Sequence, residues 1–172
     1  MDGIDGLATS QAALVAGGLA LALGSGSMLG WLGTCLTAAC MGFLPFNFPK
    51  ARIFLGDVGS GSLGYLLAVL LAGAYTAGQV AWPLLLLPLA AFLVDAGFTL
   101  AWRMLRGERW WTPHVTHAYQ VWARRTASHV QTSMAYGAFT LAGVILMHTG
   151  ISLSWSAAAW MGPLWDAVAL LS

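Results

Sequence analysis

The longest apolar stretch of the chain runs from Pro83 to Leu105 and reads PLLLLPLAAFLVDAGFTLAWRML. Its charged residues are Asp95, near the middle, and Arg103, near the end. About 20 mainly apolar residues are enough for a helix to cross the hydrocarbon core of a bilayer. This stretch therefore predicts a membrane-spanning helix, and it indicates the class of fold for the whole chain.

The composition of the chain supports the same conclusion. Of its 172 residues, 59% are hydrophobic and only 8% are charged, whereas about a quarter of the residues are charged in an ordinary soluble domain. The mean hydropathy is +0.76. So few charges cannot cover the surface of a water-soluble protein, which excludes a soluble globular fold. The net charge of +1 gives no electrostatic reason to expect a nucleic-acid partner.

Further apolar stretches lie on both sides of the first one. Together the predicted spans cover approximately 7–23, 28–44, 63–81, 83–105, 130–148 and 154–171. The sequence therefore predicts an all-α fold, a polytopic transmembrane helix bundle of about six spans. We expect residues 1–172 to form a single transmembrane domain, with polar loops at about 1–6, 45–62 and 106–129.

The basic residues lie within or beside two of these loops. They are Lys50, Arg52, Arg103, Arg106, Arg109, Arg124 and Arg125. Loops rich in Lys and Arg stay in the cytoplasm, so the positive-inside rule predicts that both loops are cytoplasmic. Alternation of the spans then places residues 1–6 on the same side.

The first polar cluster is the segment Asp2-Gly3-Ile4-Asp5-Gly6, directly before the first predicted span. Two acids spaced by three residues lie on one face of a helix start, where both can face a ligand. Acids are also favoured at a helix N-terminus by the helix dipole. Helix capping is therefore the alternative interpretation of this cluster.

The second polar cluster, residues 47–64, reads NFPKARIFLGDVGSGSLG. Its glycines would let the backbone approach a ligand, and the N–H groups entering the next span would form an anion-binding nest. A carboxylate beside such a nest repels phosphate unless a cation lies between them. Asp57 therefore indicates Mg²⁺, which takes one or two carboxylates together with phosphate oxygens. The alternative is a turn whose glycines serve helix packing.

The third polar cluster, residues 106–120, contains His114 and His117 just after Pro113. Two histidines three residues apart, after a helix-breaking proline, can face one site. They could bind a diphosphate, shuttle a proton or ligate a metal. Zinc is disfavoured because further Cys or His ligands are lacking nearby. A basic loop that contacts anionic lipid is the alternative.

In order and spacing, these segments resemble the motifs of the polyprenyl-phosphate N-acetylhexosamine-1-phosphate transferases. This membrane family includes the bacterial undecaprenyl-phosphate GlcNAc-1-phosphate transferase and the phospho-MurNAc-pentapeptide translocase. The matching segments are 2–8, 47–64 and 113–120, and residues 94–120 look closest to the O-antigen branch. The resemblance implies a Mg²⁺-dependent reaction in the bacterial inner membrane. A polyprenyl phosphate attacks the β-phosphate of a UDP-N-acetyl sugar and releases UMP, the first membrane step of cell-envelope polysaccharide synthesis.

The resemblance also implies roles for individual residues. Asp57 would hold Mg²⁺ against the donor diphosphate, which His114 and His117 would contact. The uridine side of the pocket would be formed by Asp2, Gly3, Ile4, Asp5, Asn47 and Phe54, with Phe54 able to stack on the base. Arg106 and Arg109 would be phosphate neighbours, with lipid contact as the alternative. Two positions depart from the family pattern, because Lys50 stands where members often have proline and Val115 where they often have arginine.

The family fold has about eleven spans, and its paired-acid motif lies upstream of the segments seen here. The chain contains no Asp-Asp pair. We therefore expect it to be the C-terminal half of such a transferase and inactive alone, with a complementary N-terminal half or a second copy as its protein partner. The donor sugar stays open among GlcNAc, QuiNAc and FucNAc. The competing hypothesis is a non-catalytic membrane module, a transporter half or a scaffold, for which Asp95 is the intramembrane charge.

Overall fold

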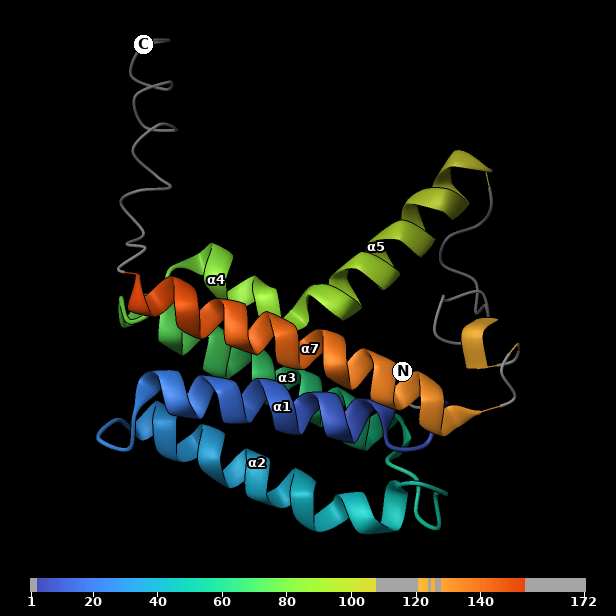
Figure 1. The fold of residues 1–172 in the computed structure, drawn as a ribbon, viewed down its shortest axis with the longest axis horizontal. Coiled ribbons are helices and arrows are strands. Elements are labelled where there is room, and N and C mark those ends of the chain that lie inside the picture. Colours follow the sequence, from blue (N-terminus) through green and yellow to red (C-terminus); the bar gives the residue numbers. More distant parts are fainter. Residues whose placement is uncertain (1–2, 108–120, 124, 126–127, 154–172) are drawn as a thin grey trace, which may run out of the picture.

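The computed structural model describes residues 3–107, 121–123, 125 and 128–153 (Figure 1). In chain order the elements are α1 (Leu7–Leu23), α2 (Met28–Asn47), α3 (Gly56–Thr76), α4 (Trp82–Leu86), the 3₁₀ helix η1 (Leu87–Leu89), α5 (Ala90–Leu105) and α7 (His129–Ser152). The described residues contain no strand. The predicted all-α fold is therefore confirmed.

Four helical segments of the described chain are long and apolar enough to cross a membrane. They are Met28–Asn47, Gly56–Thr76, Trp82–Leu105 and His129–Ser152, and Leu7–Leu23 is a shorter apolar helix. These segments agree with the predicted polytopic membrane bundle. The sixth predicted span, residues 154–171, lies outside the described residues.

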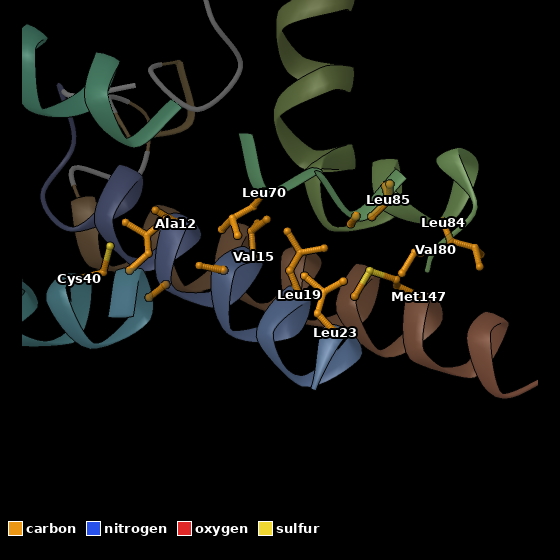
Figure 2. Close-up of a cluster of buried hydrophobic side chains, with 14 of the residues drawn as sticks. Ala12, Val15, Leu19, Leu23, Cys40, Leu70, Val80, Leu84, Leu85 and Met147 are labelled. Carbon is orange, nitrogen blue, oxygen red and sulfur yellow. The ribbon is translucent and has the colours of Figure 1, made fainter. Parts of the chain in front are cut away.

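The shortest of these apolar segments, α1, is the most enclosed. It packs against α2, α3 and α7, and most of its residues are buried (Figure 1). In the core, Val15 and Leu19 meet Met147 of α7 and their neighbours from the other helices (Figure 2). The outer helices expose large apolar side chains such as Tyr65 and Phe139. Exposed apolar surface of this kind suits contact with lipid. Since α2, α3 and α7 pack around α1, this helix forms the centre of the bundle.

Polar contacts show that α1 and α7 run parallel. Near the start of both helices, Ser133 donates a hydrogen bond to the carbonyl of Asp5. Further along, Thr140 donates to Gln11, and His148 Nε2 lies 3.1 Å from the carbonyl oxygen of Gly18. Both helices therefore begin at the same end of the bundle. The connection between α2 and α3 lies at this end too, as Figure 1 shows.

The helix ends next to the second polar cluster differ from the prediction. Helix α2 continues to Asn47 and α3 begins at Gly56, so the loop expected over 45–62 is reduced to residues 48–55. The hydroxyl groups of Ser60 and Ser62 donate to the carbonyls of Asp57 and Val58. The two hydroxyl groups are thereby satisfied inside the helix, so this polar segment can belong to α3 in spite of its glycines.

The predicted span 83–105 is divided by η1. Pro88 lies in this short element, and proline cannot supply the backbone N–H that a continuous helix needs. Beyond the break, α5 diverges from the bundle (Figure 1). The broken backbone lies close to α7, since a Cβ added at Gly143 would be 2.3 Å from the carbonyl oxygen of Leu87.

Candidate functional site

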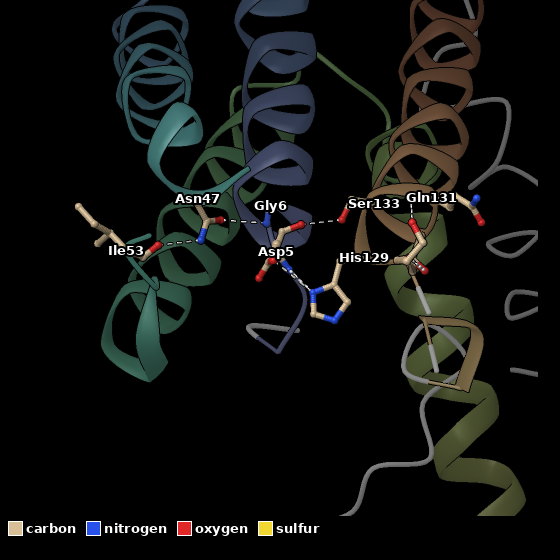
Figure 3. A network of polar contacts seen from close by, with 9 residues as sticks. Asp5, Gly6, Asn47, Ile53, His129, Gln131 and Ser133 are labelled. Atoms are coloured by element: carbon tan, nitrogen blue, oxygen red, sulfur yellow. Dashed lines mark hydrogen bonds and ion pairs between the residues drawn. The ribbon is translucent and has the colours of Figure 1, made fainter. Parts of the chain in front are cut away.

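Asn47 joins the first and second polar clusters at one end of the bundle. Its Oδ1 accepts hydrogen bonds from the backbone N–H of Gly6 and from the hydroxyl of Thr9, both at 3.1 Å. Its Nδ2 donates to the carbonyl of Ile53 at 3.0 Å, as Figure 3 shows in part. The side chain is only 6% exposed. Asn47 therefore ties the start of α1 to the loop between α2 and α3.

The loop over residues 48–55 is folded back on the end of α2. The backbone N–H groups of Arg52 and Ile53 both donate to the carbonyl of Phe46, at 2.8 and 3.2 Å. Near the end of this loop, the Phe54 side chain is 68% exposed. Asp57 is exposed as well, in the first turn of α3. An aromatic ring and a carboxylate are thus accessible beside the segment that Asn47 anchors.

The segment before α1 is a tight turn. Gly6 has a φ of 71°, and a Cβ there would meet the Phe48 side chain at 2.7 Å, so both its conformation and its close packing favour glycine. Ile4 is 5% exposed and packs with Leu7 and Ala123. The side chain of Ile4 therefore belongs to a small apolar cluster, whereas Gly3 is exposed.

Asp5 lies between this turn and the start of α7. One of its carboxylate oxygens is 3.4 Å from Nδ1 of His129, and its side chain is 20% exposed. Its carbonyl accepts the hydrogen bond from Ser133 at 2.8 Å (Figure 3). Neither His129 nor Ser133 stands out in the sequence as a site residue. Their positions in the first turns of a helix resemble ordinary capping, and nothing local to them indicates Asp5 as the partner.

Asp57 is compatible with a magnesium ion that is held jointly with a substrate. In the described part of the chain, no group of three His, Cys, Asp or Glu side chains could hold a metal ion. Mg²⁺ commonly takes one or two carboxylates, waters and the phosphates of a bound substrate, so a single accessible carboxylate suits this mode. Within the described residues no side chain caps the start of α3, and the N–H groups of its first turn would favour the phosphate itself.

Several predicted site residues fall outside the described residues. They are Asp2, Arg109, His114 and His117. Arg106 is described and ends α5, where its guanidinium carbon lies 4.6 Å from the ring centroid of Trp102. This contact holds the guanidinium beside a tryptophan of a kind that is common at membrane interfaces, which is compatible with the alternative of lipid contact. The described site thus joins the first two polar clusters, and the third stays a prediction.

Residues 1–75 match the sequence profile described as Glycosyl transferase family 4. The "Probable undecaprenyl-phosphate N-acetylglucosaminyl 1-phosphate transferase" of Bacillus subtilis is 32% identical over 167 residues, which cover 94% of this chain and 45% of that protein. By sequence, the chain belongs to this transferase family. The resemblance inferred from the motifs is thereby confirmed.

Other relatives match a shorter part of this chain. The "Phospho-N-acetylmuramoyl-pentapeptide-transferase" of Moorella thermoacetica is 48% identical over 66 residues, 37% of this chain and 20% of that protein. The protein of the same name from a Synechococcus species is 41% identical over 83 residues, 48% of this chain and 23% of that protein. The chain thus spans less than half the length of these family members. No solved structure matches the chain. The relatives and the apolar helices identify a multi-pass membrane protein.

Proposed function

We propose that this protein acts in the transfer of an N-acetylhexosamine-1-phosphate from a UDP-sugar to a polyprenyl phosphate such as undecaprenyl phosphate, with release of UMP. The observation that carries the proposal is the set of hydrogen bonds made by Asn47. They bring the segment of Asp5 against the loop that presents Phe54 and leads into Asp57 at the start of α3. The names of the relatives, which include a phospho-sugar transferase for undecaprenyl phosphate, support this class of reaction.

In this proposal each accessible group has a separate task. Phe54 stacks on the uracil base, and Asp5 with the exposed backbone of Gly3 borders the same end of the nucleotide. Asp57 and the first-turn N–H groups of α3 bind the diphosphate end. Mg²⁺, when bound at Asp57, would neutralise the charge on the diphosphate and so favour departure of UMP. Phosphoryl transfer depends mainly on such positioning and charge neutralisation.

The proposal includes residues whose structure is not described. Asp2 would complete the uridine side, and His114, His117 and Arg109 would contact the diphosphate. We place the whole site on the cytoplasmic face of the bacterial inner membrane. The positions of Lys50 and Arg52, exposed in the same loop between α2 and α3, support this orientation by the positive-inside rule.

We further propose that transfer needs groups from another segment, supplied by an N-terminal half or by a second copy. The greater length of the relatives and the lack of an Asp-Asp pair in this sequence support the idea. Purified protein, alone and co-expressed with the N-terminal half of the Bacillus subtilis relative, would be supplied with UDP-GlcNAc, undecaprenyl phosphate and Mg²⁺. We expect UMP and lipid-linked sugar only from the complemented sample. Robust turnover by the chain alone would contradict the need for a partner segment.

The same assay tests the role of Asp57. In the complemented sample, Asp57→Asn should lower kcat by about a hundredfold or more, since a charge-stabilising group of the transition state is lost. Ser62→Ala, which removes a hydroxyl bonded within α3, is the control and should retain near-normal turnover. Turnover of Asp57→Asn close to that of the unchanged protein would refute the metal role. No transfer with any UDP-N-acetyl sugar would contradict the proposed function.

A transport role is the second candidate, because Asp95 is a buried acidic residue inside a predicted span. Asp95 is 5% exposed and borders a largely apolar pocket of about 400 Å³, which is also lined by Phe98 and Phe139. Intramembrane charges often mark transport pathways. Uptake of a UDP-sugar into proteoliposomes, in the absence of lipid-linked product, would favour transport over transfer.

A further inference from the structure

We infer that His129, the first residue of α7, is a positioning residue for the nucleotide end of the site and acts by holding Asp5. This inference rests on the proposed function, in which Asp5 borders the uridine. His129 would not need to touch the nucleotide itself. Its effect would pass through the orientation of the Asp5 carboxylate.

The same ring nitrogen of His129 faces two groups of Asp5. Nδ1 lies 3.4 Å from Oδ2 of the Asp5 carboxylate and 3.5 Å from its backbone nitrogen (Figure 3). With a proton on Nδ1, the imidazole donates to the carboxylate, and without one it accepts from the backbone N–H. The ring therefore orients the Asp5 carboxylate when Nδ1 carries the proton, and it restrains the Asp5 backbone when Nδ1 does not.

The surrounding contacts hold both partners in place. The start of α7 is capped, because the hydroxyl of Ser128 accepts a hydrogen bond from the backbone N–H of Gln131. One turn further, the buried Ser133 donates to the carbonyl of Asp5. On the other side, Asn47 accepts from the N–H of Gly6. The backbone at Asp5 is thus fixed from two sides, and His129 acts on the side chain that is still partly accessible.

Because His129 is about half exposed, replacing it should change the position of Asp5 without lowering the stability of the fold. Its side chain is 47% exposed, so the ring contributes little to the packed core. The N-cap of α7 is Ser128, so the helix does not need the imidazole to begin. Replacing His129 should therefore release the Asp5 carboxylate while the fold is kept.

The test is steady-state transfer by the complemented enzyme with varied UDP-GlcNAc. We expect His129→Ala to raise KM for the nucleotide sugar by about threefold to tenfold, the effect of one ordinary lost hydrogen bond, with kcat changed by less than about twofold. His129→Asn, whose amide can occupy the position of Nδ1, should restore most of the affinity. His148→Ala is the matched control, because His148 lies on the same helix and contacts Gly18 far from Asp5.

A double-mutant cycle tests the route through Asp5. In an Asp5→Asn background, His129→Ala should raise KM by less than about half of its effect in the unchanged protein. An equal effect in both backgrounds, or an unchanged KM in His129→Ala, would overturn the inference and leave the proposed function intact. If the unchanged protein transfers no sugar, the proposed function fails. UDP binding by calorimetry then tests the inference separately, and equal affinities of the unchanged protein and His129→Ala would overturn it.

Discussion

The buried amide of Asn47 holds two segments of the candidate site together. Burying an amide costs free energy unless its N–H groups and its oxygen are hydrogen-bonded. In Asn47 both Oδ1 and Nδ2 have hydrogen-bond partners. The motif resemblance assigns Asn47 to the uridine pocket, and that contact stays a prediction. The structure adds a positioning role, since the exposed Phe54 and the Asp5 segment lie on the two sides of the amide.

Asn47→Ala should lower the free energy of unfolding by about 1–3 kcal/mol, because the N–H of Gly6 and the carbonyl of Ile53 lose their partner in a buried place. Unfolding in detergent, followed by circular dichroism, measures the change. Thr9→Val is the control, since it leaves Asn47 bonded to Gly6 and Ile53 and should cost less. A stability of Asn47→Ala equal to that of the unchanged protein would contradict the bridging role.

At the scale of the elements, α7 has two kinds of contact. Polar contacts align it with α1, from Asp5 at one end to Gly18 at the other. Small residues let it approach the broken span, and the closest approach is at Gly143, against the backbone of η1. Close approach through small residues is a general device of membrane helices, where the hydrophobic effect between helices is absent. Helix α7 therefore links the core helix α1 to the divergent α5.

Gly143→Ala should destabilise the protein by about 1–3 kcal/mol, because the new methyl group would collide with the carbonyl of Leu87, which cannot move without the backbone. Thermal unfolding in detergent would measure the loss. Gly137→Ala is the matched control on the same helix, since the nearest atoms to its added Cβ are 3.9 Å away. Equal stability of the two variants would contradict the close contact between Gly143 and the backbone of η1.

At the scale of the whole molecule, polar groups gather at one end. The starts of α1, α3 and α7 share this end, and Asp5, Asp57 and His129 lie in or just before these helix starts. The turn between α1 and α2 lies at the opposite end (Figure 1). Chemistry on a lipid headgroup needs such a gathering at one membrane surface, whereas a transport route would place such groups across the bilayer.

This arrangement predicts opposite labelling of two exposed residues, Ser25 and Lys50. In a background without Cys35 and Cys40, Ser25→Cys should react with a membrane-impermeant maleimide from the periplasmic side. Lys50→Cys should react only in inside-out vesicles. Labelling of both cysteines from one side would contradict the placement of α2, which separates the two positions, as a membrane span.

Much of the fold could be predicted from local properties of the sequence. The bounds of α1 agree with the predicted stretch, and α5 ends at Leu105 as expected. Apolar length and the position of charges decide a membrane span residue by residue, so these features need no knowledge of distant contacts. The start of α3 was predicted wrongly, because the polar, glycine-rich residues before Leu63 are helical although glycine propensity disfavours a helix there.

The membrane fold, the family and the residues considered for the site could all be inferred from the amino-acid sequence. The packing of the helices was needed to establish that α1 is innermost, that the Ile4 side chain is buried and that His129 lies against Asp5. The physical reason is that a membrane helix is apolar on lipid-facing and buried sides alike, so periodicity does not reveal its neighbours. Contacts between residues 124 positions apart, such as Asp5 and His129, arise only when the helices pack.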